Sequence, residues 1–353
     1  MPPDAAFQGG LEQLASLPRF SLAQLPTPIH RLENFVRHTG DIDLWIKRDD
    51  LTGLVGGGNK TRKLEFLIGG ALARGFDMLV TVGAIQSNHT RQTAAAAAKA
   101  GMKCALLHNG WTQDGGPAYR KVGNILFSSL MGAELYLDGS ERPIEDEGPL
   151  EDLVANLTRQ GHNPYLIPGG ASDHPLGSFG YAACAAEIIA QSREQGIAFD
   201  YIVHCTGSSS TQSGLLAGLA ALESDIQVIG IPDDEETEIK KARVMRLANA
   251  ALEHLSAPQR VRPEAVEIIV GDASSYGVSD AITFEAIGLM ARTEGLIADP
   301  VYEGKAVRGL LDLARSGRFA PGSKVLLMHL GGTPATHAYA NQYDEIDLKP
   351  LHD

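Results

Sequence analysis

Residues 53–67 read GLVGGGNKTRKLEFL, and the interpretation of the whole chain depends on this stretch. Three consecutive glycines lead into Asn59 and Lys60, after which the pattern predicts an amphipathic helix. The stretch nearly fits the phosphate-loop pattern G-x-x-x-x-G-K-[ST], but Asn59 stands where the lysine belongs. Because the lysine is displaced by one residue, a nucleotide-binding loop is a weak interpretation. Lys60 remains a candidate for a catalytic lysine or a surface cation.

The bulk properties of the chain restrict its class. A length of 353 residues suggests two domains, and 44% hydrophobic residues is ordinary for a globular protein. The formal net charge of -13, without a basic cluster, argues against nucleic acid and anionic membrane surfaces as partners. No apolar run reaches the ~18 residues that would cross a bilayer, and the N-terminal residues lack the features of a signal peptide. We therefore expect a cytoplasmic protein with no nucleic acid or membrane partner.

The cysteines point to the same compartment. Cys104, Cys184 and Cys205 are isolated from one another, and each lies in an apolar run. No C-x-x-C or H-x-x-x-H spacing occurs among the cysteines and histidines. We expect buried free thiols, as in a cytosolic protein, and no metal site.

Short apolar runs alternate with helical patterns along the chain. The first series of predicted strands is at residues 79–84, 104–109, 133–137 and 164–170, and the second is at 201–208, 226–232, 266–271 and 324–332. Helical patterns lie between them at residues 87–101, 177–196 and 211–224. This alternation predicts an α/β protein with two open, twisted, mostly parallel sheets that helices cover on both faces.

Polar motifs follow several predicted strands, at the sheet edge where α/β proteins bind ligands. In TGSSSTQSG, residues 206–214, glycine, serine and a helix N-terminus would make a phosphate cup. The alternative is a flexible loop with a Ser/Thr helix cap. In IQSNHTRQ, residues 85–92, Ser87, Asn88 and His89 could bind a carboxylate, although an ordinary N-cap on Ser87 is the simpler interpretation.

Two tyrosine motifs are less specific. DPVYEGKA, residues 299–306, places Tyr302 and Glu303 at the start of a helix, where a buried core tyrosine and a favourable first-turn carboxylate are the alternatives. YGVSD places Tyr276 beside a turn.

Together these motifs become specific. In order, IKRDD, GGGNKTRKLEFL, GAIQSNHTRQTAA, IPGGASDHPLG, GSSSTQSG, DPVYEGKA and HLGG resemble the pyridoxal-phosphate enzymes of the 1-aminocyclopropane-1-carboxylate (ACC) deaminase and D-cysteine desulfhydrase family, over residues 14–339. The resemblance implies the tryptophan synthase β-like fold (PLP fold type II), with pyridoxal 5′-phosphate bound between two domains. The larger domain would comprise residues 1–60 and 171–353, the smaller inserted domain residues 61–170, and the protein would form a homodimer.

The resemblance also implies roles for individual residues. Lys60 would carry the cofactor as a Schiff base, Asn59 would bind its 3′-oxygen, and Glu303 would lie beside its pyridine nitrogen. The phosphate would lie in the loop of Gly207, Ser208, Ser209, Ser210, Thr211 and Gln212, with the contacting hydroxyls left open. The substrate would be bound by Ser87, Asn88, His89, Lys63 and Leu330. The catalytic groups would be Lys60, Ser87, Tyr276 and Tyr302.

The family divides between two chemistries that act on small amino acids. Glu303 and Leu330 resemble the deaminases, which convert ACC to 2-oxobutanoate and ammonia, whereas desulfhydrases tend to carry Ser or Thr at both positions. His89 instead matches the desulfhydrases. We therefore expect an ACC deaminase, with a D-cysteine desulfhydrase or L-cysteate sulfo-lyase as the alternative. Outside the family, a nucleotide-dependent ligase and a non-catalytic pyridoxal-phosphate-binding protein remain as further alternatives.

Overall fold

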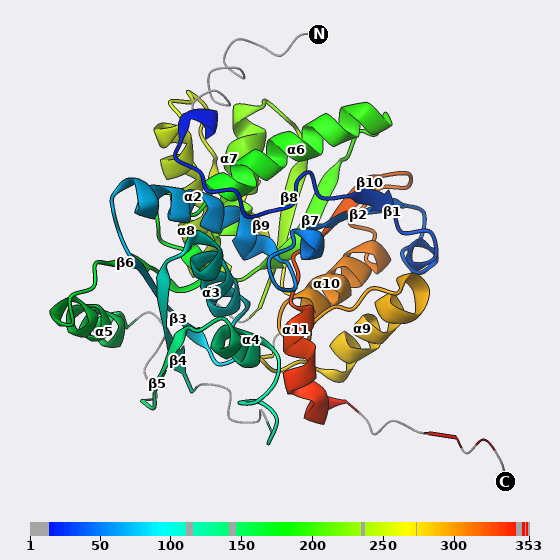
Figure 1. The fold of residues 1–353 in the computed structure, drawn as a ribbon. Coiled ribbons are helices and arrows are strands. Elements are labelled where there is room, and N and C mark those ends of the chain that lie inside the picture. The colour runs from blue at the N-terminus through cyan, green and yellow to red at the C-terminus, as the bar shows by residue number, and fades with distance from the viewer. Residues whose placement is uncertain are drawn as a thin grey trace.

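A computed structural model describes residues 14–110, 116–140, 146–233, 237–272, 274–343, 348–349 and 351 (Figure 1). The strands are β1 (Ile29–Arg31), β2 (Asp43–Arg48), β3 (Met78–Ala84), β4 (Lys103–Asn109), β5 (Glu134–Asp138), β6 (Pro164–Ile167), β7 (Tyr201–Thr206), β8 (Gln227–Pro232), β9 (Glu267–Ile268) and β10 (Lys324–His329). The α-helices are α2 (Asn59–Ala73), α3 (Asn88–Ala100), α4 (Asn124–Leu130), α5 (Gly148–Arg159), α6 (Phe179–Gln195), α7 (Ser210–Ala221), α8 (Thr237–His254), α9 (Ala281–Glu294), α10 (Glu303–Arg315) and α11 (Thr333–Thr336). Short 3-10 helices are η1 (Phe35–His38), η2 (Asp49–Leu51), η3 (Gly169–Ala171), η4 (Pro263–Ala265) and η5 (His337–Gln342).

The strands form two sheets, as the sequence predicts. The larger has the order β1-β2-β10-β7-β8-β9 and is parallel except for β1, which runs antiparallel to β2. The smaller has the order β5-β4-β3-β6 and is parallel throughout. All strands of the smaller sheet lie within residues 61–170, and those of the larger sheet lie outside that range. The domain boundaries themselves stay a prediction.

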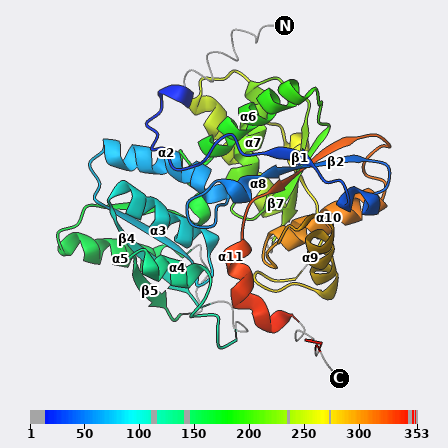
Figure 2. The same cartoon turned by 45° about the vertical axis from the view of Figure 1, so that its right-hand side comes forward.

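Side chains of the larger sheet alternate between two buried cores. On β10, Leu326 and Met328 pack into a core with α6, α7 and α8, whereas Val325 and Leu327 pack into another with α9 and α10. Successive residues of a strand point to opposite faces, so a run that is apolar throughout requires cover on both faces. Figure 2 shows these helices on the two sides of the sheet.

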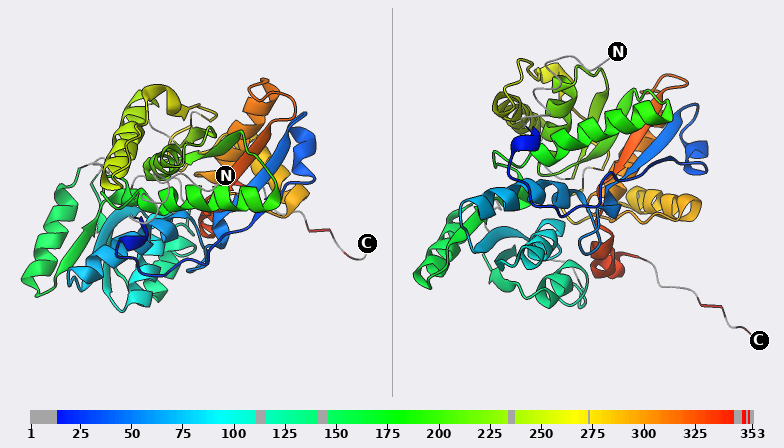
Figure 3. Two further views of the ribbon diagram at one scale, coloured as in Figure 1. Left: turned by 90° about the horizontal axis from the view of Figure 1, so that it is seen from above. Right: turned by 45° about the horizontal axis from the view of Figure 1, so that its top comes forward.

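The two halves of the fold meet along α11 and the segment after it. Figures 1 and 3 show α11 between the helices of the smaller sheet and those of the larger one. Tyr339 and Ala335 are buried here in a cluster with Ile85 and Tyr119 from the smaller half and Val301 from the larger half. This packing holds the carboxyl ends of the two sheets close to each other.

The sequence analysis missed β1 and β2, and it overestimated β9. Lys47 and Arg48 interrupt the apolar pattern of β2, although Lys47 is fully buried in the structure. Residues 266–271 form only the two-residue strand β9, at the edge of the sheet. In the part of the chain that the structure describes, no helix combines the length and apolarity needed to span a membrane.

Candidate active site

A cavity of about 390 Å³ lies where segments from the two sheets meet. Its walls include residues that directly follow β6, β7, β8 and β10. The predicted site residues that line it are Asn59, Lys60, Ser87, Asn88, His89, Gly207, Ser208, Ser209, Thr211, Tyr276, Tyr302, Glu303 and Leu330. The remaining three predicted residues, Lys63, Ser210 and Gln212, do not line it. Segments far apart in the sequence therefore converge on one volume.

Lys60 reaches the cavity from the first turn of α2. The turn before it needs glycine, because a Cβ on Gly57 would lie 1.8 Å from the Asp50 carbonyl oxygen. The Lys60 ammonium donates a hydrogen bond to Ser208 Oγ at 3.1 Å. Burial lowers the pKa of Lys60 to about 8, against the opposing effect of the Asp233 charge. A substantial share of the amine is therefore neutral, and so nucleophilic, at mildly alkaline pH.

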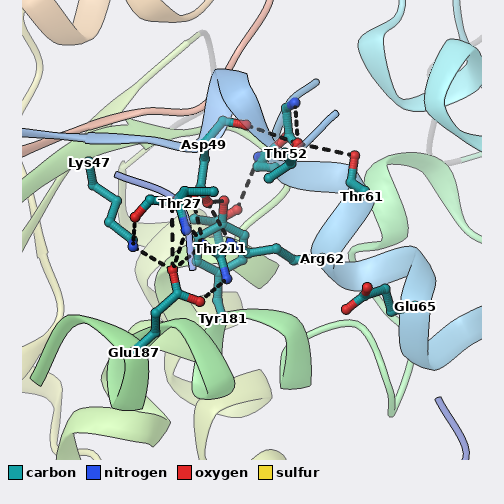
Figure 4. Close-up of polar contacts among 12 residues, drawn as sticks. Thr27, Lys47, Asp49, Thr52, Thr61, Arg62, Glu65, Tyr181, Glu187 and Thr211 are labelled. Carbon is teal, nitrogen blue, oxygen red and sulfur yellow. Dashed lines mark hydrogen bonds and ion pairs between the residues drawn. The ribbon is translucent and has the colours of Figure 1, made fainter. Parts of the chain in front are cut away.

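The helix that carries Lys60 is held from its far side by a buried ionic cluster (Figure 4). Arg62 donates to both oxygens of Asp49 at 2.8 Å and to both oxygens of Glu187 at 2.9 Å. Tyr181 donates to Asp49 at 2.6 Å. Residues two positions apart point to different faces of a helix, so this anchoring fixes the rotation of α2 that aims Lys60 at the cavity.

The predicted phosphate loop begins directly after β7. Ser208 Oγ accepts from Lys60, and Thr211 Oγ1 accepts from Asn59 Nδ2 at 3.2 Å. Ser209 adopts φ 65°, an uncommon left-handed conformation for a residue other than glycine. Its hydroxyl is buried and has no hydrogen-bond partner in the described structure. Such a group is costly unless a ligand satisfies it.

Gln212 and Lys63 lie elsewhere than the sequence analysis expected. The Gln212 side chain turns away from the cavity and donates to the Glu267 carbonyl at 2.9 Å. Lys63 was expected at the substrate, but its ammonium lies behind the loop and donates to Ser210 Oγ at 2.8 Å. Burial and the nearby Lys60 hold the pKa of Lys63 well below its usual value. An anion in the loop would favour the charged form of Lys63.

Ser87 caps a helix and also faces the cavity, so its cap role is observed and its carboxylate-binding role stays a prediction. Its Oγ caps α3 by accepting from the backbone N–H groups of His89, at 3.2 Å, and Thr90, at 3.3 Å. The same side chain lines the cavity. Because the oxygen only accepts in the cap, its own proton remains available to a carboxylate in the cavity.

His89 presents an acceptor rather than a charge. Thr81 donates its hydroxyl proton to the Ile167 carbonyl at 2.7 Å, so His89 Nε2 must donate to Thr81 Oγ1, 2.8 Å away. The other ring nitrogen, Nδ1, is then a buried acceptor without a partner in the described structure. Burial, with the charges of Lys60 and Lys63, holds the pKa of His89 well below its usual value.

Tyr302 and Tyr276 meet in the cavity. The Tyr302 hydroxyl donates to that of Tyr276 at 3.0 Å, and the two rings pack edge to face with centroids 5.8 Å apart. Burial, followed by the nearness of Tyr276 and Asp233, raises the pKa of Tyr302 well above its usual value. Tyr302 therefore keeps its proton across the physiological pH range.

Glu303, the first residue of α10, presents a buried carboxyl to the cavity. Burial and the charge of Asp299 raise its pKa well above the usual value, although the carboxyl also accepts a hydrogen bond from the backbone of Leu330. His329 Nδ1 lies 4.0 Å from Glu303 Oε2. A cation beside this carboxyl would stabilise its ionised form.

Two carboxylates of this region escaped the sequence analysis. Asp233 follows β8, lines the cavity and forms an ion pair with Lys240 at 2.8 Å. Asp299 accepts from the backbone N–H of Tyr302 at 2.9 Å, and burial raises its pKa to about 7. Asp299 opens the motif DPVYEGKA, so its place just before the helix was visible in the sequence. Asp233 stands in an acidic stretch that looks like a solvated loop.

Comparison with known proteins identifies the family. Residues 20–331 match the family model described as pyridoxal-phosphate dependent enzyme. The chain belongs to this family. As a pyridoxal-phosphate dependent enzyme, it uses pyridoxal phosphate as its cofactor. Among the described residues, no group of three or more His, Cys, Asp or Glu side chains is arranged to hold a metal ion.

Several relatives of this pyridoxal-phosphate enzyme share one name, 1-aminocyclopropane-1-carboxylate deaminase. The 1-aminocyclopropane-1-carboxylate deaminase of Burkholderia ambifaria (strain MC40-6) is 44% identical over 330 residues, which cover 93% of this chain and 98% of the relative. That of Rhizobium leguminosarum bv. viciae is 42% identical over 335 residues, covering 94% and 99%. A crystal structure described as an ACC deaminase homologue superposes with a TM-score of 0.86 at 38% identity, covering 95% of this chain and 98% of that one. That homologue shares the PLP type II fold.

The cavity of this pyridoxal-phosphate enzyme fits the cofactor. The buried, partnerless hydroxyl of Ser209 lies beside the N-terminus of α7, which attracts anions, and Lys63 supports the same loop from behind. Lys60 offers an amine whose lowered pKa suits it to bond an aldehyde carbon. The loop at the N-terminus of α7 would therefore bind the phosphate of the cofactor, and Lys60 would bond its aldehyde carbon.

Proposed function

We propose that this enzyme is an ACC deaminase, which converts 1-aminocyclopropane-1-carboxylate and water to 2-oxobutanoate and ammonia. The observation that carries the proposal is that the buried Glu303 carboxyl lies in the same cavity as Lys60. Opening an unactivated ring breaks a carbon–carbon bond and needs a strong electron sink, which a carboxylate beside the pyridine nitrogen favours. The relatives named for this activity, matched over nearly their full length, support the same substrate.

The residues around the loop would hold the cofactor. Lys60 would bind it covalently, Asn59 would donate to its 3′-oxygen, and Glu303 would partner its ring nitrogen. The loop from Gly207 to Gln212 would bind its phosphate through backbone N–H groups and the Ser209 hydroxyl, with the Lys63 charge behind them. When bound, the cofactor withdraws electrons from the bonds around the carbon that carries the substrate amino group.

The first turn of α3 would bind the substrate carboxylate. The Ser87 hydroxyl has its proton free to donate, because its oxygen accepts from two backbone N–H groups of the helix. The N-terminus of α3 adds a partial positive charge. Asn88 is fixed by a hydrogen bond between its Oδ1 and Asn124 Nδ2 at 2.8 Å. These groups would hold the reacting carbons beside Lys60 and the two tyrosines.

Lys60 and the tyrosine pair would move the protons of the reaction. The reaction breaks one ring carbon–carbon bond, adds a proton to the released carbon and replaces the carbon–nitrogen bond by a carbonyl whose oxygen comes from water. The amine of Lys60 can take or give a proton at substrate carbons. Tyr302 remains protonated beside Tyr276, so the pair can supply a proton to the released carbon.

The test is an assay of the purified, cofactor-loaded protein against ACC, D-cysteine, L-cysteine, L-cysteate and D-serine. The expected result is 2-oxobutanoate and ammonia from ACC, with a higher kcat/KM than for any other compound. Release of sulfide or sulfite together with pyruvate, without turnover of ACC, would replace the proposal by the C–S lyase alternative.

Three further parts of the proposal concern the domains and the oligomeric state, which rest on the family resemblance, and the compartment, which rests on the sequence. The domains would comprise residues 1–60 with 171–353 and residues 61–170, and the protein would be a homodimer in the cytoplasm. The buried free thiols of Cys104, Cys184 and Cys205 agree with a reducing compartment. Light scattering of the purified protein measures the oligomeric state directly.

A further inference from the structure

Tyr276 reaches the cavity from a segment whose described residues form no helix or strand. The segment connects β9, which ends at Ile268, to α9, which begins at Ala281. Its base is held by Asp272, whose carboxylate accepts from the Ser274 N–H at 2.8 Å and from Thr283 Oγ1 at 2.6 Å. A group that acts on a substrate must be held more closely than a loop backbone alone provides.

Lys305 supplies the missing support. It lies on α10, is fully buried, and donates to the carbonyl oxygens of Ser274 at 2.7 Å and Ser275 at 3.4 Å. It also donates to the Asp233 carbonyl at 2.7 Å. An ammonium has three protons to donate and no acceptor, so these carbonyls match its capacity. Among the described residues Lys305 forms no ion pair. Its ammonium instead donates only to backbone carbonyls, those of Asp233 in one loop and of Ser274 and Ser275 in the other.

The same helix also carries the partner of Tyr276. Tyr302 is the N-cap residue of α10, and Lys305 lies three positions later, which places the two side chains on the same side of the helix. Tyr276 directly follows Ser275, whose carbonyl Lys305 binds. The hydrogen bonds from Lys305 to Ser274 and Ser275 therefore tie the backbone beside Tyr276 to the helix that begins at Tyr302, and with it the contact between the two hydroxyls.

We propose that Lys305 is a positioning residue for the reaction, which holds Tyr276 in reach of Tyr302 and the substrate by binding the Ser274, Ser275 and Asp233 carbonyls. This inference rests on the proposed function, in which both tyrosines act on the substrate. It predicts that Lys305 contributes to turnover through Tyr276 and not through general support of the fold.

A double-mutant cycle tests this coupling. Lys305→Met should lower kcat for ACC by about 10- to 100-fold, the scale of a 1 Å misplacement of a reacting group. In the Tyr276→Phe background the same change should lower kcat by less than about threefold. Lys240→Met is the matched control, because Lys240 is an equally buried lysine that binds the Thr206 carbonyl and Asp233. Its effect should be the same in both backgrounds.

Equal losses from Lys305→Met in the two backgrounds, or full activity of Tyr276→Phe, would overturn the proposal. Should Lys305→Met fail to fold, Lys305→Gln keeps an amide donor and replaces it in the cycle. A substrate-independent readout separates this inference from the proposed function. Amide hydrogen exchange of residues 274–277 should accelerate at least about tenfold in Lys305→Met, beyond any change in Lys240→Met. Unchanged exchange there would refute the positioning role even if the protein does not turn over ACC.

Discussion

Lys60 and Tyr302 face the same cavity, yet burial shifts their pKa values in opposite directions. The pKa of Lys60 is lowered to about 8, whereas that of Tyr302 is raised well above its usual value. Both shifts have the same cause, because a low-dielectric surrounding disfavours the charged form of each group. At mildly alkaline pH the cavity therefore contains a neutral amine that can accept a proton and a phenol that retains one.

The lowered pKa of Lys60 predicts how fast cofactor-free protein captures pyridoxal phosphate. Only the deprotonated amine attacks the aldehyde, so the rate of appearance of the visible absorption band should rise through a midpoint near pH 8. The negative charge of Asp233 opposes the lowering, so Asp233→Asn should move the midpoint to lower pH. Stopped-flow absorbance measures both. Lys60→Ala should give no band and no turnover, and a midpoint near 10.5 would mean that another lysine reacts.

Ser87→Ala should separate the two roles of this residue. Loss of a hydrogen bond to a charged carboxylate should weaken substrate binding by about 1.5–3 kcal/mol, and loss of the cap should lower the free energy of unfolding by about 1 kcal/mol. Asp280→Ala is the matched control, because Asp280 caps α9 by accepting from the Thr283 N–H at 2.8 Å. Asp280→Ala should lower the free energy of unfolding and leave substrate binding unchanged. Equal losses of cofactor and substrate affinity in Ser87→Ala would make Ser87 a cap only.

Glu303 and Leu330 should set the type of reaction. In the proposed role of Glu303 as partner of the ring nitrogen, its replacement by Ser would remove the negative charge and weaken the electron sink, which would harm carbon–carbon cleavage more than expulsion of a sulfur leaving group. Glu303→Ser combined with Leu330→Thr should therefore shift the ratio of kcat/KM from ACC toward D-cysteine. An unchanged ratio would show that these positions do not choose the chemistry.

At the scale of elements, α2 depends on buried charges at its far side. The cluster of Lys47, Asp49, Arg62 and Glu187 contains two cations and two anions, so it is formally neutral as a whole. Burial alone would raise the pKa of Asp49, but the charges of Arg62 and Lys47, together with the hydrogen bonds from Arg62 and Tyr181, outweigh it and the net shift is downward. The carboxylate therefore stays ionised, and its stabilisation is lost only as the pH falls through the lowered pKa.

Removing one charge from this cluster should be costly. Arg62→Met leaves buried carboxylates without their main partner and should lower the free energy of unfolding by about 3–5 kcal/mol. The matched control is Arg246→Met, which breaks an exposed two-bond contact with Asp173 and should cost at most about 1 kcal/mol. Urea denaturation of both variants measures the difference. Similar losses would show that the cluster gives α2 no particular support.

Most elements could be predicted from periodicity, and the exceptions have physical reasons. Strands that are mostly apolar and buried, such as β7 and β8, were found within two residues of their observed ends. β2 was missed because its Lys47 is buried by pairing with Glu187 on α6, a contact that no local pattern announces. The positions of Lys60 and Glu303 followed from motifs. The motifs did not predict the directions in which side chains point. Lys63 and Gln212 were therefore expected in the cavity, but neither of them lines it.

At the scale of the whole molecule, the cavity takes walls from both halves of the fold. Pyridoxal phosphate should bind only the assembled structure, so removing it should destabilise the protein. At a free cofactor concentration of 100 times Kd, the free energy of unfolding should rise by about 2.7 kcal/mol. Urea unfolding with and without cofactor checks this, and Lys60→Ala should show a smaller gain. A gain independent of Lys60 would place the cofactor elsewhere.

The strand order of the larger sheet has a consequence for how the enzyme is made. β10, near the end of the described chain, lies between β2 and β7, and the Asn59 N–H donates to the Leu330 carbonyl at 2.9 Å. A Cβ on Gly331 would lie 2.7 Å from Gly58 Cα, so the segment after β10 packs directly against the start of α2. On the ribosome, the smaller sheet can close as soon as residue 167 has emerged, whereas β1 and β2 must wait for β10. We therefore expect a nascent chain to capture its cofactor only after β10 has been made, and a chain cut before β10 to leave β2 and β7 with unpaired strand edges.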